Sequence, residues 1–309
     1  MMKTNIKRER GKQIMSDYVL SCCSTADLSK AHFQSRGIHY VCFHYILNGQ
    51  DRPDDLGESM AFDEFYRLLS EGADAKTSQV SIQEYLDFFT PFLEQGKDVV
   101  HVSLSSGISA TYNSARNAAN IAMERFPERK IYVVDSLAAS SGYGLLMDAA
   151  ADRRDEGLSA EELVEWIEAE RLRLNHWFFS SDLSFFVKGG RISKTAAVFG
   201  GLLEICPLMN VDDHGRLVPR YKVRTKKRVI RQAAEKMAKL ADEGENYDGK
   251  CYISQSACYE DARQLADLIE ARFPKLQGKV EINDIGTTIG SHTGPGTVAL
   301  FFWGARRED

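Results

Sequence analysis

The sequence lacks any long apolar run, and this absence excludes a membrane-spanning segment. The longest apolar stretch, 196–203, contains two glycines and ends at Glu204, far short of the about 20 residues that a spanning helix needs. The first thirteen residues are mostly polar and charged and contain no apolar core, so we expect no signal peptide.

Cysteine is scarce, with six residues in a chain of 309. No two of them have the two-residue spacing of metal ligands, and the adjacent Cys22 and Cys23 are poorly placed to bridge each other. We therefore expect reduced thiols in a cytoplasmic protein, and no metal site.

Neither sign of charge dominates: the net charge is −5, with 27% charged and 43% hydrophobic residues. These values are typical of a soluble globular protein that is long enough for two domains. Mild acidity argues against a nucleic-acid-binding role for the whole protein.

The first half of the chain alternates apolar, β-branched segments with helical patterns. The expected strands are Tyr18–Cys22, Ile38–Leu47, Val99–Leu104 and Ile131–Val134. The expected helices are Ala61–Ser70, Ala110–Glu124, Ser140–Arg154 and those that follow the capping boxes at Ser81 and Ser159. Such alternation predicts a parallel sheet with helices on both faces.

The second half has a different pattern. The segments 205–211 and 217–223 read as a hairpin around 212–215, followed by helices near 229–241 and 260–273 and strands near 252, 280 and 298–303. The predicted fold class is α/β with two domains: a parallel α/β/α domain at 17–175 and a mixed-sheet α/β domain at 176–309, with a ligand between them.

Three polar segments are candidates for binding an anion. In the first, the strand ending at Leu104 passes through Ser105, Ser106 and Gly107 into a helix, whose first N–H groups have no partner of their own. Ser109 and Thr111 add hydroxyls there. Ordinary helix capping by serine explains the same residues.

The second segment is Thr77-Ser78, just ahead of the helix that begins after Ser81. Ligands of parallel sheets bind at the carboxyl ends of the strands, where Ser24, Thr77, Ser105 and Ser136 are expected. The third segment is 289–296, in which three glycines and Pro295 surround His292. A histidine held on such a loop can donate to a carboxylate or phosphate oxygen.

A basic block lies in and after the predicted hairpin. It contains no acidic residue and comprises Arg216, Arg220, Lys222, Arg224, Lys226, Lys227, Arg228 and Arg231. It is either a solvated face or a docking surface for an acidic partner or a phosphate.

Together these segments resemble the DegV family of fatty-acid-binding proteins. The matching motifs, in the family's order, are at 24–28, 77–79, 103–115, 134–136, 188–193, 222–227 and 289–296. The resemblance implies one long-chain fatty acid in a tunnel between two domains. It also implies a carrier without catalytic residue, cofactor or metal, which presents the fatty acid to a separate, ATP-binding fatty acid kinase that makes acyl phosphate.

The resemblance also implies roles for individual residues. The ligand-binding residues would be Thr77, Ser78, Ser105, Ser106, Ser109, His292 and Gly294, and the kinase-facing residues Arg191 and Arg224. The implied partners include no nucleic acid, and membrane contact would be transient. The sequence departs from the family pattern at Cys23, where the family usually has Asp, at Val80 (Pro) and at Ala110 (Gly).

Other functions fit some of the same residues. Ser105 or Ser106 as nucleophile, with His292 as base and Asp135 as orienting acid, would make an acyl hydrolase, but the sequence lacks a G-x-S-x-G elbow. The hydroxyl loops also suit another lipid or a small phosphorylated ligand, although neither a P-loop nor a dinucleotide fingerprint is present. The apolar residues that could line a tunnel fit core packing equally well: Phe178, Phe179, Phe185, Phe186, Val198, Phe199, Leu202 and Leu203.

Overall fold

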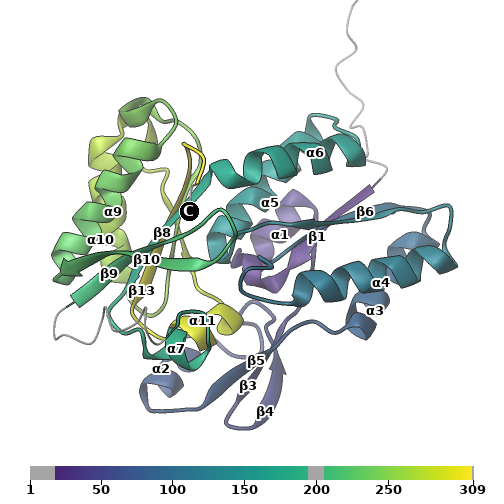
Figure 1. Cartoon of the computed structure of the whole chain (residues 1–309), viewed down its shortest axis with the longest axis horizontal. Coiled ribbons are helices and arrows are strands. Elements are labelled where there is room, and N and C mark those ends of the chain that lie inside the picture. Colours follow the sequence, from purple (N-terminus) through teal and green to yellow (C-terminus); the bar gives the residue numbers. More distant parts are fainter. Residues whose placement is uncertain (1–17, 194–204, 308–309) are drawn as a thin grey trace, which may run out of the picture.

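The computed structural model describes residues 18–193 and 205–307, and Figure 1 shows their arrangement. Four of the apolar residues considered for a tunnel wall, Val198, Phe199, Leu202 and Leu203, lie outside the described residues. Three sheets organise the remainder.

The first sheet is parallel, in the order β2-β1-β6-β7, as the alternating pattern predicts. Its strands are β1 (Tyr18–Cys23), β2 (Ile38–Val41), β6 (Asp98–Ser103) and β7 (Ile131–Asp135). Its helices are α1 (Lys30–Arg36), α3 (Ile82–Glu94), α4 (Thr111–Arg125), α5 (Ser140–Asp155) and α6 (Ala160–Glu170). In Figure 1, α4 and α6 lie on opposite sides of β6, so both faces of the sheet are covered.

The second sheet is mixed, in the order β10-β9-β8-β13-β11-β12. Its strands are β8 (Leu174–Ser180), β9 (Ile205–Val211), β10 (Leu217–Arg224), β11 (Cys251–Gln255), β12 (Glu281–Asp284) and β13 (Thr297–Trp303). Helices α9 (Lys226–Leu240) and α10 (Tyr259–Arg272) cover one face, and α5 packs on the other. The predicted mixed-sheet α/β half of the fold is confirmed.

The third sheet was not predicted. It is antiparallel, in the order β4-β3-β5, with β3 (His44–Leu47), β4 (Gln50–Pro53) and β5 (Ala75–Ser78), and α2 (Phe62–Ser70) belongs to the same region. The predicted single strand over 38–47 is wrong, because the chain leaves the parallel sheet after Val41 and enters the third sheet at His44. Asn48 and Gly49, both at positive φ, form a tight hairpin turn from β3 into β4.

Helix α5 joins the two halves of the protein. Eleven of its sixteen residues are buried, around its whole circumference. A helix without a polar face must be buried on all sides, and α5 contacts the parallel half on one side and β8, β11 and β13 on the other. Helix α5 therefore packs against both halves of the protein and forms part of the interface between them.

Two short helices complete the region between the halves: α7 (Ser184–Lys188) and α11 (Thr287–Thr293). They contact each other, and α11 also contacts β3, β5 and α2. None of the helices within 18–193 and 205–307 has the length and apolar composition of a membrane span.

Candidate functional site

A cavity of about 300 Å³ lies between the two halves of the protein. One wall comes from β5 and the loop after β6, and another from the start of α5. Most of the remainder comes from β8, β9, β10, β13, α7 and α11. Most of the lining is apolar, with these aromatic and aliphatic side chains: Phe43, Leu104, Ile108, Ala110, Ala139, Phe178, Phe186, Val211, Leu217, Ile285, Ile289, Ala299 and Phe301.

The floor of the cavity is formed by two antiparallel strands. Alternate residues of a strand point to the same face, and the register pairs Phe178 of β8 with Ala299 of β13 and His176 with Phe301. Thr297 begins the same row. From Thr297 to Phe301 the floor extends about 14 Å at a rise of about 3.4 Å per residue. The floor of the cavity therefore runs along the strands over about 14 Å.

Three polar side chains from distant parts of the chain meet at one part of the cavity wall. Nε2 of His292 lies 2.7 Å from Oγ1 of Thr77, and Nδ1 of His292 lies 3.4 Å from Nη1 of Arg191. A guanidinium can only donate, so Nδ1 is the acceptor and the proton is on Nε2. Nε2–H then donates to the Thr77 oxygen, which leaves the Thr77 hydroxyl proton available to a ligand. Of the described residues, these three and Gln79 and Ser109 form the polar end of the cavity.

Burial and the neighbouring guanidinium control the charge of this polar end. Burial, with a smaller contribution from Arg191, lowers the pKa of His292 from 6.5 to about 4. His292 is therefore neutral at neutral pH and acts as a hydrogen-bonding group. Burial also lowers the pKa of Arg191. Arginine nevertheless keeps its charge in proteins, because its guanidinium is a very weak acid. The positive charge at this end belongs to Arg191.

Helix α11 determines where His292 lies, which differs from the predicted loop. Residues 287–293 are helical, and the fixed turn begins only at Gly294, at φ +66. Asp54 holds the first turn of α11, accepting from the Thr287 hydroxyl (2.9 Å) and from the Thr288 N–H (3.3 Å). His292 therefore comes from the last turn of a helix whose first turn is anchored to the segment after β4.

Thr77 and Ser78 lie on β5 and not in a loop ahead of α3. Thr77 faces the cavity, whereas Ser78 is exposed and pairs with His44. Because strand neighbours point to opposite faces, the strand admits only one of these two hydroxyls to the cavity. Gly294 is buried behind the polar end, where its carbonyl accepts from the Ser256 hydroxyl at 2.7 Å.

The three serines of the loop after β6 are differently placed. Ser109 lines the cavity, and its hydroxyl oxygen accepts from the N–H of Thr111, the first residue of α4, at 3.2 Å. Ser105 is buried and donates to the Gly215 carbonyl at 2.8 Å. Ser106 is exposed, and its N–H donates to the Asp135 carboxylate at 3.1 Å.

These contacts bear on the hydrolase alternative. The Asp135 carboxylate accepts from backbone N–H groups and His292 donates to Thr77, so neither serine of the loop after β6 shares a hydrogen bond with His292 in the described structure. A nucleophile, its base and an orienting acid have to be linked in that order. The described contacts therefore do not form the serine–histidine–aspartate chain that the hydrolase alternative needs.

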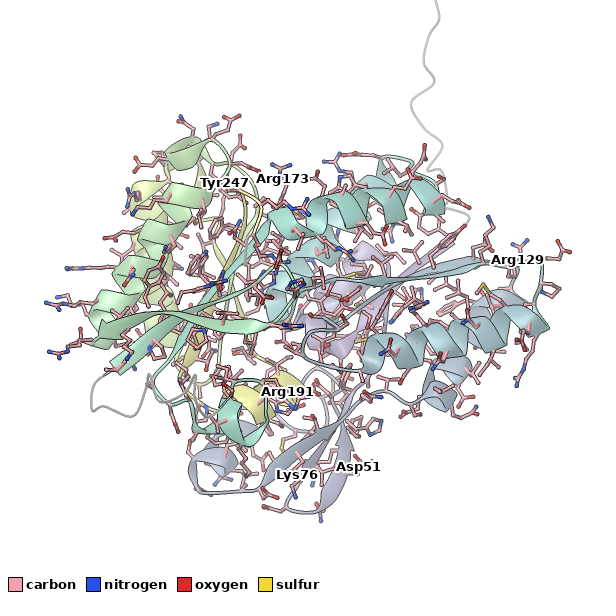
Figure 2. All side chains as sticks on the ribbon, viewed as in Figure 1. Asp51, Lys76, Arg129, Arg173, Arg191 and Tyr247 are labelled. Atoms are coloured by element: carbon pink, nitrogen blue, oxygen red, sulfur yellow. The ribbon has the colours of Figure 1, made fainter. Side chains whose placement is uncertain are left out.

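The two arginines expected on a partner surface lie in different surroundings. Arg191 is half-buried in the cavity wall and donates from Nε to the Ile108 carbonyl at 3.2 Å. Figure 2 shows it between the two halves. Arg224 is exposed at the end of β10, within the basic block.

Cys23, one of the positions at which the sequence is expected to depart from the family pattern, is fully buried. Its Sγ lies 3.4 Å from the Tyr85 hydroxyl and 3.8 Å from Nε2 of His101. Burial raises the pKa of the thiol to about 11, so the group is neutral. Across 18–193 and 205–307 all six cysteines are unbridged, and no cluster of three metal-ligating side chains occurs.

Some residues of the cavity were missed by sequence reasoning. Ser140, His176, Thr288 and Thr297 add polar atoms to the walls, and nothing in their local sequence distinguishes them from core residues. Gln79 could have been found, because it belongs to the same T-S-Q motif as Thr77.

The fold and the site define a class: α/β proteins of two halves that enclose a largely apolar cavity with a polar group on its wall. A family model described as "Uncharacterised protein, DegV family" matches residues 23–304. The chain belongs to the DegV family.

Relatives and solved structures support this assignment. The chain is 34% identical over 295 residues to a DegV domain-containing protein of Clostridium perfringens, covering 95% of this chain and 100% of that one. A DegV family protein of Thermus thermophilus, described as fatty-acid-binding, superposes with a TM-score of 0.80 at 26% identity, covering 93% of this chain and 99% of that one. The fold is also that of the fatty acid kinase B3 protein of Streptococcus pneumoniae, loaded with linoleic acid, with a TM-score of 0.79, 24% identity and coverage of 94% and 99%.

Proposed function

We propose that this protein binds a long-chain fatty acid in the cavity and presents the carboxylate to a separate fatty acid kinase, which makes acyl phosphate from ATP. The observation that carries the proposal is the cavity itself: a largely apolar lining, with a polar group on one part of the wall, where Thr77, Arg191 and His292 meet. This shape matches a molecule with one acidic head and a long apolar tail.

The tail supplies most of the affinity. Each buried methylene contributes about 0.8 kcal/mol, so a chain of about sixteen carbons gains about 10 kcal/mol before the costs of binding. A hydrogen bond to a charged head contributes about 1.5–3 kcal/mol. The polar end therefore sets which head group is accepted and where the carboxylate lies, while the apolar walls determine how tightly the ligand is held.

The carboxylate would lie between Thr77, whose hydroxyl proton is available, and the Arg191 charge. Ser109 borders the same end, and His292 holds Thr77 in the donating orientation. A kinase has to reach this end of the cavity, and the exposed Arg224 with the basic block offers it a positive surface.

The proposal treats 17–175 and 176–309 as two domains that close around the ligand. Its support is that all parallel-sheet strands come from residues before 136 and all mixed-sheet strands from residues after 173. The unbridged cysteines and the need for ATP agree with a cytoplasmic location.

Two measurements test the proposal separately. Mass spectrometry of lipid extracted from freshly purified protein should find fatty acid, and delipidated protein should bind a fluorescent long-chain fatty acid. Ala299→Leu, which fills the floor, should lower the bound lipid, whereas the exposed Ala305→Leu should not. No lipid and no binding would contradict the carrier function. Fatty acid binding without acyl phosphate formation in the presence of any fatty acid kinase and ATP would contradict only the kinase part.

A further inference from the structure

The hairpin of β9 and β10 forms one wall of the cavity and crosses to the other half of the protein. Val211 and Leu217, on either side of its turn, line the cavity. The turn between them rests on the loop after β6: the Ser105 hydroxyl donates to the Gly215 carbonyl at 2.8 Å. This contact lies next to the part of the hairpin that lines the cavity.

The hairpin turn approaches the loop at 105–107 so closely that position 107 has room only for glycine. A Cβ on Gly107 would lie 2.5 Å from the His214 carbonyl oxygen and 2.6 Å from that of Gly215. The hairpin turn and the loop at 105–107 thus touch backbone to backbone. A small displacement of the hairpin would separate its turn from the loop at 105–107 and open the cavity between them.

Arg307 is buried behind this contact, near the end of the chain. Its side chain is 4% exposed, and its guanidinium donates to three backbone carbonyls: Leu137 at 3.0 Å, Asp212 at 3.1 Å and Arg171 at 3.1 Å. Its own N–H donates to the Leu172 carbonyl at 2.8 Å. One side chain therefore connects the segment after β7, the hairpin turn and the segment before β8.

The chemistry of the guanidinium explains why an arginine is needed. A planar fork with five N–H donors can serve carbonyls in several directions, which an ammonium group does less well. Burial lowers the pKa of Arg307 to about 10, and Asp212 and Asp213 oppose that shift, so the group is charged at neutral pH. In the described structure it forms no ion pair with a carboxylate, so its hydrogen bonds go to main-chain atoms and fix the backbone itself.

We propose that Arg307 is a positioning residue that holds the β9–β10 hairpin against the loop at 105–107 and thereby controls how fast the ligand leaves the cavity. The effect on ligand exchange rests on the proposed fatty acid binding. The effect on the hairpin is independent of the proposed fatty acid binding, because it follows from contacts within the protein.

The test uses the full-length chain with Arg307→Met and, in case that variant folds poorly, Arg307→Lys, which keeps the charge but loses the fork. Arg173→Met is the matched control. Arg173 also links two distant segments, since its guanidinium donates to the Asp242 carboxylate, but it makes no hydrogen bond to the hairpin in the described structure. Figure 2 shows Arg173 far from Arg191 and the polar end.

Two readouts are measured for each variant: hydrogen–deuterium exchange of the amides at 211–217, without added ligand, and the dissociation rate of a fluorescent long-chain fatty acid. We expect Arg307→Met to speed both by about tenfold or more, corresponding to about 1.4 kcal/mol, with Arg307→Lys in between and Arg173→Met unchanged.

The outcomes separate the inference from the proposed function. The inference is overturned if folded Arg307 variants have the same rates as the wild type, both for amide exchange at 211–217 and for ligand dissociation. Faster amide exchange in a protein whose wild type binds no fatty acid would support the Arg307 contact and contradict the proposed function. Equal acceleration by Arg173→Met would show general destabilisation and would also overturn the inference.

Discussion

Thr77 and His292 are 215 positions apart in the sequence, and a hydrogen bond of 2.7 Å joins their side chains. The bond links the small antiparallel sheet to the end of α11, and it fixes the direction in which the threonine hydroxyl can donate. The polar end of the cavity therefore depends on the docking of two segments that belong to different halves of the chain.

The first prediction concerns the Thr77 hydroxyl. Thr77→Val keeps the shape of the side chain and removes the group that would donate to the carboxylate. Since a hydrogen bond to a charged group contributes about 1.5–3 kcal/mol, fatty acid affinity should fall about tenfold to a hundredfold. Isothermal titration calorimetry of the delipidated protein with a long-chain fatty acid measures this affinity. Ser78→Ala, on the opposite face of the same strand, should bind as the wild type does, and equal losses in both variants would refute the role of Thr77.

The second prediction is a pH dependence of stability from His292. Its pKa is about 4 in the folded protein and about 6.5 when unfolded, so the unfolded chain binds more protons between these values. The stability that comes from neutral His292 is complete above pH 6.5 and is lost as the pH falls towards 4.

His292→Gln, which does not titrate, provides the comparison. The difference in the free energy of unfolding between the wild type and His292→Gln should shrink from about pH 7 to about pH 5, measured by urea denaturation. The other histidines are common to both proteins and cancel in the difference. A difference independent of pH would mean that His292 has an ordinary pKa in the folded state.

The third prediction concerns the contact beneath the hairpin turn. Gly107→Ala places a methyl group 2.5 Å from the His214 carbonyl, so the hairpin has to move. Overpacking of this kind costs about 1–3 kcal/mol, and we expect a lower melting temperature together with faster fatty acid release. The exposed neighbour Ser106→Ala is the control. Unchanged release in a folded Gly107→Ala protein would show that the hairpin does not limit exchange.

The fourth prediction separates partner docking from ligand binding. Arg224 is exposed and lies outside the cavity wall, so Arg224→Glu should leave the lipid content unchanged while reversing charge in the basic block. The rate of acyl phosphate formation with the kinase should fall, and the loss should be smaller at high salt. Lys279→Glu, an exposed change beside the opposite edge strand of the mixed sheet, should have no effect. A normal rate with Arg224→Glu would remove Arg224 from the docking surface.

Sequence patterns predicted much of the fold because they report local preferences. The apolar run 99–104, the capping boxes at Ser81 and Ser159 and the hairpin pattern at 205–223 each specify an element within a short stretch, and the structure confirms them. The third sheet was missed because the run 38–47 is apolar except for His39 and His44, and periodicity cannot show that its two ends enter different sheets.

In the candidate site too, some features could be predicted from the sequence and others depend on the folded structure. Residue types and their order along the chain were enough to indicate polar segments and family membership. Only the folded chain decided that Thr77 faces the cavity while Ser78 faces water, that His292 ends a helix, and that the Ser105 hydroxyl is taken by the Gly215 carbonyl. Each of these depends on contacts between segments that are distant in sequence, and such contacts arise from packing and hydrogen bonding across the whole molecule, which no local pattern contains.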